Sequence, residues 1–272
     1  LKKMSQQLLA SQPQKRSSAP HSSSTSLIQA QLFNQQTEVT ELPVCTYSGD
    51  IDPLHPQNSD KIYYDPEQYL QGILQKAWAQ SQNSFVGDIL IEGFHTPMIV
   101  NDDDNQLLYS NEFQEALLHT MTLLPLTRSH IHIRALTPQE TEHLKQQHLF
   151  VEQPLDAMVW KIALWTARGR LPRGTTLTAP VILNHWPNLT RWVLIPHALE
   201  IAALWSAQPY SLLETAEILK IHHYHVFAFF SAAQAVKSAS IDKTAKSKGQ
   251  LSNAISLSQR SLFQWLLARL RI

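Results

Sequence analysis

The stretch YSLLETAEILKIHHYHVFAFFSAAQA, residues 210–235, decides how the second half of this chain is expected to fold. Its spacing resembles a helix-turn-helix, in which a small residue in the first helix lets the second helix pack across it. The positions that match this pattern are Ala216, Leu219, Ile221 and Val226. The sequence therefore predicts helices over 211–219 and 224–235, and a preceding helix over 196–208 completes a trihelical or winged-helix-like unit.

The residues upstream of this pair continue the helical pattern back to Pro154. A helix is expected over 155–168, because its apolar residues recur at helical spacing. A loop follows over 169–174, and a short strand is expected over 180–184. Together these segments predict a helical domain that spans residues 153–236.

Residues 61–152 mix helical and strand patterns instead. Asp65-Pro66-Glu67 predicts a helix that runs to about Gln82, because it supplies an N-cap, a proline at the first position and an early acid. Ile89 and Ile91 are expected to share the buried face of a strand. The other expected elements are strands over 85–92, 98–100, 107–109 and 130–134, a helix over 112–124, and a helix that opens with a capping box at Thr137.

The ends of the sequence differ in composition from its middle. Residues 1–60 are rich in Ser, Gln and Thr and predict a disordered leader. Residues 237–250 are polar and basic and predict a linker, and residues 251–272 predict an amphipathic helix. The fold class expected is α+β: a small mixed α/β domain over 61–152, the all-helical winged-helix-like domain over 153–236, and the C-terminal helix.

Composition limits the function. The formal net charge of the 272 residues is +0, which argues against a strongly basic nucleic-acid binder. Cys45 is the only cysteine, so no internal disulfide can form, and a reducing compartment is indicated. No secretory signal and no apolar run of about 18 residues is visible, so a cytoplasmic protein is expected.

The second helix of the 211–235 pair is aromatic rather than basic. No Arg or Lys occurs between His222 and Lys237, whereas a DNA-reading helix needs groups that contact bases and phosphates. The sequence therefore predicts a partner-binding surface at His222, His225 and Phe229. A DNA-binding transcriptional regulator that uses the helix-turn-helix is the alternative. His222 and His225 have i, i+3 spacing, but no acidic or Cys ligand lies close in sequence, so no metal site is predicted.

Two further segments could contact partners. The loop over 168–174 holds Arg168, Arg170 and Arg173, whose guanidinium groups suit an anion or an acidic partner, although a solvated Gly-Pro turn also accounts for it. The tail helix places one apolar face along Phe263, Leu266, Leu267 and Leu270. That face can dock on a partner, on an anionic membrane surface for peripheral contact, or on the protein's own core, and all three remain open.

Catalytic motifs are not visible. The sequence has no Gly-x-Ser-x-Gly elbow, no zinc-hydrolase helix and no dinucleotide fingerprint, and its seven glycines make phosphate-cradling loops scarce. We therefore expect a protein that is not an enzyme and that takes no cofactor.

The order of these parts is similar to a known family. Residues 68–111, with the string Val86-Gly87-Asp88-Ile89-Leu90-Ile91, resemble the PATAN or DUF4388 type of bacterial regulatory domain, which often carries a winged-helix-like module after it. The strings 203–205, 208–212 and 229–233 would lie in that module. The resemblance covers about residues 65–236. It implies a signalling adaptor with partners such as small Ras-like GTPases, roadblock proteins, response regulators or type IV pilus and motility proteins.

Overall fold

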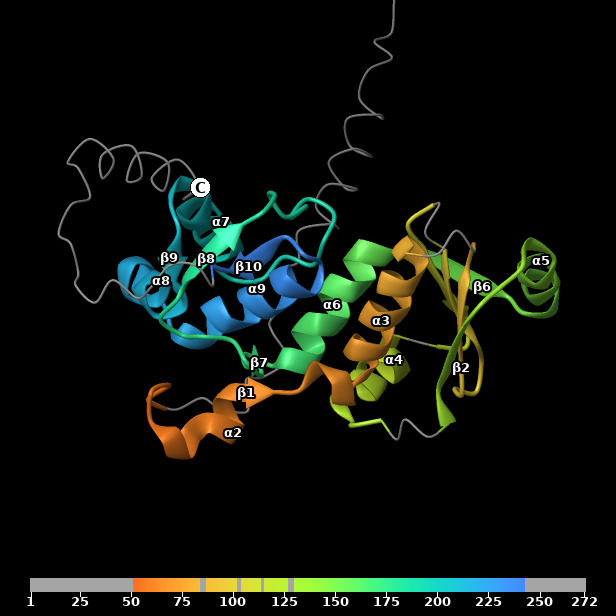
Figure 1. Cartoon of the computed structure of the whole chain (residues 1–272), viewed down its shortest axis with the longest axis horizontal. Coiled ribbons are helices and arrows are strands. Elements are labelled where there is room, and N and C mark those ends of the chain that lie inside the picture. The colour runs from red at the N-terminus through yellow and green to blue at the C-terminus, as the bar shows by residue number, and fades with distance from the viewer. Residues whose placement is uncertain (1–50, 84–86, 102–103, 114, 127–129, 243–272) are drawn as a thin grey trace, which may run out of the picture. The chain divides into compact units, whose positions relative to one another are not determined.

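The computed structural model describes residues 51–83, 87–101, 104–113, 115–126 and 130–242 (Figure 1). Helices and three small sheets make up this part of the chain, which confirms the predicted α+β class. Residues 1–50 of the predicted leader and the whole predicted tail helix, 251–272, lie outside the described residues. The prediction of disorder is wrong for the end of the leader, because residues 56–60 lie in a 3-10 helix and at the start of an α-helix. Among the described residues, no helix combines the length and the apolar composition that a membrane crossing requires.

The described chain opens with short elements that precede the first long helix. They are η1 (Pro56–Asn58), α2 (Ser59–Ile62), β1 (Tyr63–Tyr64), η2 (Pro66–Gln68) and α3 (Leu70–Asn83). Asp65 caps η2, since its carboxylate accepts a hydrogen bond from the Glu67 N–H, but the predicted single helix from Asp65 is wrong. Tyr69 has extended backbone angles (φ −124°, ψ 169°), so the helix proper starts only at Leu70.

A five-stranded antiparallel sheet follows, in the order β5-β2-β3-β4-β6. Its strands are β2 (Ile89–Glu92), β3 (Met98–Asn101), β4 (Gln106–Ser110), β5 (His132–Ala135) and β6 (Phe150–Pro154). The predicted strands over 98–100 and 107–109 are confirmed as β3 and β4, and they form a hairpin in which Met98 pairs with Tyr109. Strand β6 was not predicted: it lies at the sheet edge, is mostly exposed, and shows no apolar alternation.

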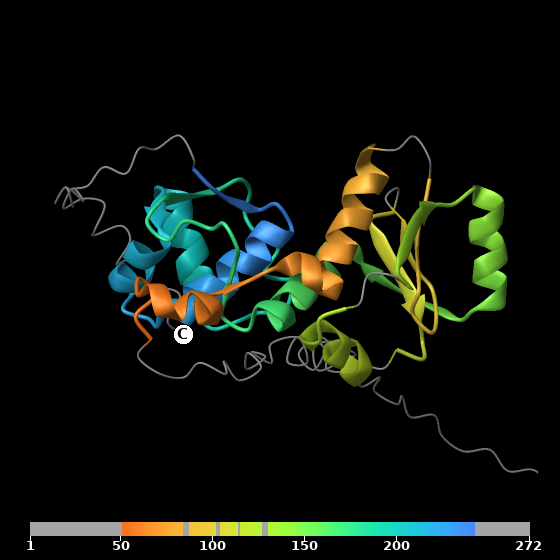
Figure 2. The same ribbon diagram turned by 60° about the horizontal axis from the view of Figure 1, so that its bottom comes forward.

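Helices cover both faces of this sheet (Figures 1 and 2). On one side lie α3, α4 (Glu115–Leu123) and α6 (Leu155–Ala167), and on the other lies α5 (Pro138–Gln147). The prediction that Ile89 and Ile91 share a buried face of β2 is confirmed, and the opposite face of the strand is buried as well. Leu90 is 1% exposed, because Leu144 of α5 packs against it on the opposite face.

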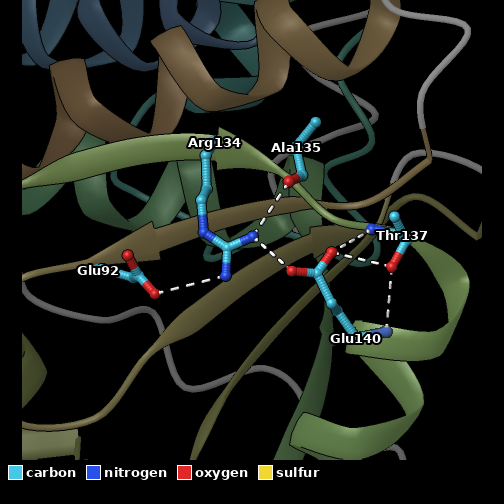
Figure 3. A network of polar contacts seen from close by, with 5 residues as sticks. All are labelled: Glu92, Arg134, Ala135, Thr137 and Glu140. Atoms are coloured by element: carbon cyan, nitrogen blue, oxygen red, sulfur yellow. Dashed lines mark hydrogen bonds and ion pairs between the residues drawn. The ribbon is translucent and has the colours of Figure 1, made fainter.

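Figure 3 shows how α5 is attached to the sheet. The predicted capping box is confirmed: Thr137 Oγ1 accepts from the Glu140 N–H, and the Glu140 carboxylate accepts from the Thr137 N–H at 2.8 Å. The guanidinium of Arg134, on β5, forms ion pairs with two carboxylates: its Nη1 lies 3.0 Å from Glu140 Oε1, and its Nη2 lies 3.7 Å from Glu92 Oε1. The bonds from Thr137, and then Arg134, lower the pKa of Glu140.

Helix α6 connects the sheet to the second half of the chain. It packs against α3 on one side and against α9 (His223–Ala235) on the other (Figure 1). Its Trp160 is fully buried beside Phe229 of α9, and the Trp160 indole N–H donates to the Val193 carbonyl at 3.0 Å. One hydrophobic core therefore extends from the sheet, through α6, into the helices of the second half.

The second half contains the three helices that the sequence predicted. They are α7 (Ala198–Ala207), α8 (Leu212–Leu219) and α9, and the predicted helix over 155–168 is α6. A small sheet in the order β10-β8-β9 lies with them, built from β8 (Pro180–Leu183), β9 (Tyr210–Ser211) and β10 (Ala239–Ile241), so the expectation of an all-helical domain is wrong. β8 confirms the predicted strand over 180–184. The two-stranded sheet pairs β1 with β7 (Leu171–Pro172) in parallel.

Strand β10 corrects the first part of the predicted linker over 237–250, and residues 243–250 lie outside the described residues. Ser238 is fully buried, and its carbonyl accepts from the Asn184 N–H at 2.8 Å, which starts the pairing of β10 with β8. The lysines of this segment favour a solvent-exposed linker, but the three residues of β10 are enough to add an edge strand beside β8.

Candidate partner-binding groove

Phe229, which the sequence placed in a partner contact, lies in the core. Its side chain is 0% exposed, and its ring centroid lies 5.6 Å from that of Trp160 and 5.5 Å from that of Trp205. The prediction of a surface role for Phe229 is therefore wrong. Helix α9 contacts α6, α7, α8, β7 and β10, and its three phenylalanines, Phe227, Phe229 and Phe230, have no exposed surface.

The first turn of α9 carries the two other predicted contact residues. His222 is the N-cap, and its Nδ1 accepts from the Tyr224 N–H at 3.4 Å. The ring of His225 lies 4.0 Å from that of Tyr224 and 4.9 Å from that of His197, and the rings of His222 and His223 are 4.2 Å apart. We call His197, His222, His223, Tyr224 and His225 the histidine cluster.

The histidine cluster is partly buried, and burial shifts the pKa of two of its histidines. Burial lowers the pKa of His223 to about 4, and the neighbouring His222 adds to the effect. Burial likewise lowers the pKa of His225 to about 4, with smaller contributions from His197 and His222. His223 and His225 are therefore uncharged at neutral pH and present aromatic surface. Within the described residues, no group of three or more His, Cys, Asp or Glu side chains is placed to hold a metal ion.

These shifts predict a loss of stability in mild acid. Below pH 6.5 the unfolded chain protonates His223 and His225, whereas the folded chain does so only near pH 4. The free energy of unfolding should therefore fall as the pH drops through this window, by about 1–2 kcal/mol for each histidine after a discount for solvent access. Urea unfolding at about pH 7 and about pH 4.5 measures the difference.

The control for this prediction is the double variant His223→Gln, His225→Gln. Glutamine does not titrate, so the variant should lose less stability between the two pH values than the wild-type chain. An equal loss in both proteins would mean that other groups cause the acid sensitivity.

An apolar groove runs beside the histidine cluster along the outer side of α8. We call it the α8 groove; its volume is about 510 Å³. Leu213 and Ala216 of α8 are half-buried there. The lining residues are Leu213, Ala216, Glu217, Ile221, His222 and His223 on one side and Ile51, Asp52 and Pro53 on the other.

The local sequence explains why α8 presents this side. A capping box between Ser211 and Glu214 starts the helix. Thr215 anchors its inner side, because its hydroxyl accepts from the Trp205 indole N–H at 2.8 Å and donates to the Ser211 carbonyl at 2.7 Å. Ala216, expected to admit the second helix, packs against the hydrophobic core that includes α9 and also lines the α8 groove, where its small side chain leaves room.

The arginine loop is only partly available for binding. Arg170 is 9% exposed; its Nε donates to the Ala167 carbonyl at 3.0 Å and its Nη2 to the Thr166 carbonyl at 2.9 Å. Its guanidinium also lies over the Tyr64 ring. Arg170 therefore closes the end of α6 rather than facing a ligand. Arg173 is exposed, and its Nη2 lies 3.4 Å from Asp60 Oδ1. The anion-binding role of this loop stays a prediction.

Sequence reasoning found His222 but missed the rest of the α8 groove. The outward spacing of Leu213 and Ala216 on a helix whose inner side is already apolar was the available signal. No signal could link them to Ile51, which is distant in sequence. Comparison of the chain with protein-family models, with curated proteins and with solved structures gave no match.

Proposed function

We propose that this protein is a non-enzymatic, cytoplasmic regulator that acts by protein–protein interaction through the α8 groove. The observation that carries the proposal is an open groove whose wall combines half-buried apolar side chains with the uncharged ring of His223. Such a surface suits a short apolar segment of a partner protein, because burial of apolar area supplies the affinity and the rings supply aromatic contacts.

We also propose that α7, β9, α8 and α9 form, with β8, a winged-helix-like module within residues 153–236, after a PATAN-like domain over 61–152, and that β10 extends this module to Ile241. The placement of β9 between the first two helices, and of β10 after the third, supports this assignment. Small GTPases, roadblock proteins and type IV pilus or motility proteins are the partner classes to test first. The tail face at Phe263, Leu266, Leu267 and Leu270 is a second proposed contact.

The burial of α9 favours a protein partner over DNA. In a helix-turn-helix regulator the second helix enters the major groove, but α9 buries nine of its thirteen residues, including Phe227 and Phe230. The α8 groove also contains the acidic residues Asp52 and Glu217, which would repel phosphates. Both observations weigh against the alternative of a DNA-binding regulator.

Affinity purification with the full tagged chain tests the proposal. Ala216→Arg should fill the α8 groove and lower recovery of the specific partner at least about tenfold, or about 1.4 kcal/mol of binding free energy. Ile218→Arg is the matched control, since Ile218 is 37% exposed on the same helix and does not line the groove. Thermal melting of both variants checks that they fold.

Two results would overturn the proposal. The first is recovery of the same partner with Ala216→Arg as with wild type. The second is tight binding of duplex DNA by the pure protein, measured by fluorescence anisotropy, that weakens steeply as salt is added.

A further inference from the structure

The charged side chains of the α8 groove all have the same sign. Asp52 and Glu217 line it, and none of its nine lining residues is Lys or Arg. Asp52 belongs to the start of the described chain, and Glu217 lies in the last turn of α8. Figures 1 and 2 both show that start of the chain, in orange, near α8. Each of the two walls of the groove therefore carries one carboxylate.

Within the described residues, no ion pair neutralises these two carboxylates. Both side chains are exposed, and neither pairs with a described Lys, Arg or His. Asp52 Oδ1 accepts a hydrogen bond from the Leu54 N–H at 2.9 Å, which leaves the charge of the carboxylate in place. Lys220 follows α8 but does not line the groove. Both carboxylates are therefore open to a cation from outside.

The histidines of the groove do not supply a positive charge at neutral pH. Burial lowers the pKa of His223 to about 4. His222 accepts the Tyr224 N–H through Nδ1, and only an uncharged ring offers that acceptor. The helix ends do not decide the sign either, because α8 ends and α9 begins beside the groove, and these two ends have opposite partial charges. The groove thus combines apolar side chains with a net negative charge.

We propose that the α8 groove selects a partner segment in which apolar side chains stand next to a Lys or Arg. This inference rests on the proposed function, because it names the partner chemistry of the same site. The apolar side chains of such a segment pack on Leu213, Ala216 and Ile221. Its cation faces Glu217 or Asp52. A segment with Asp or Glu in that place meets like charges and is rejected.

Selection from a library of random peptides displayed on phage tests this preference. The bait is the full chain, and every selected sequence is measured again on Ala216→Phe, which fills the groove without adding a charge. Peptides that lose binding on this variant depend on the groove. They should combine apolar residues with Lys or Arg and contain few Asp or Glu. Thermal melting checks that Ala216→Phe folds.

Charge reversal at Glu217 tests the electrostatic contribution separately. Glu217→Lys should fold, because a cation in the last turn of a helix is favourable. It should raise the Kd of a synthetic groove-dependent peptide at least about threefold, measured by fluorescence anisotropy. A peptide in which Glu replaces the Lys or Arg should regain affinity for this variant. Glu142→Lys is the matched control, since Glu142 is exposed on α5 and does not line the groove, and it should leave the Kd unchanged.

The outcomes separate the two proposals. Groove-dependent peptides without Lys or Arg, or an equal Kd for Glu217→Lys and Glu142→Lys, would overturn the charge selection and leave the interaction site standing. If no selected peptide depends on the open groove, the proposed function falls and this inference falls with it.

Discussion

Replacing Phe229 with alanine is expected to lower the free energy of unfolding by about 4 kcal/mol. The Phe229 ring has no exposed surface and packs edge-on against Trp160 and Trp205, which belong to two different helices. Alanine would leave a cavity where α6, α7 and α9 meet, and these helices cannot close together without displacing the indole rings. Urea unfolding of the variant and of the wild-type chain measures the difference.

Trp186→Ala is the control for this prediction. Trp186 is also a large aromatic residue, but 51% of it is exposed, so its loss should change stability by no more than about 0.5 kcal/mol. A cost below about 1 kcal/mol for Phe229→Ala would show that its ring is not part of the core. The original expectation of a surface contact at Phe229 would then return.

The second large effect is expected for Gly93→Ala, at about 4 kcal/mol, because backbone strain and a steric clash add together. Gly93 follows β2 with a φ of 108°, which side-chain-bearing residues rarely adopt. A Cβ atom there would lie 2.0 Å from the His130 carbonyl oxygen, in the segment that leads into β5. The edge strand β5 would have to move away from β2, and this should also be visible as a lower thermal midpoint.

Gly174→Ala separates the two contributions. Gly174 also has a positive φ, 86°, but a Cβ atom there meets nothing within 4 Å. The substitution should cost only about 1 kcal/mol from backbone strain. Equal effects at Gly93 and Gly174 would contradict a close approach between Gly93 and His130.

The helices and caps could be predicted because their signals are local. Helices α6, α7, α8 and α9 carry apolar residues at helical spacing, and the caps at Thr137 and Ser211 are fixed by residues three positions apart. The β3–β4 hairpin follows from a polar turn between two short apolar runs. In each case neighbours along the chain decide the structure.

The features that could not be predicted depend on distant residues. Strands β6 and β10 are short edge strands, and β10 exists only because Asn184 and Ser238 meet across 54 positions of sequence. An aromatic helix has the same sequence pattern whether its rings contact a partner or the core. Phe229 is buried because Trp160 of α6 and Trp205 of α7 pack against it. The α8 groove needs Ile51 on its second wall.

The strand order β10-β8-β9 has a consequence for synthesis of the chain. The central strand, β8, is made first, and its two neighbours are made later. On the ribosome, β8 must therefore wait for β10 with an open edge, and at ~5–20 residues per second the delay is on the order of several seconds. An open strand edge invites pairing with other nascent chains. Slow translation between β8 and β10 would thus favour aggregation. Co-expression of chaperones that bind nascent chains at the ribosome should therefore raise the yield of soluble protein.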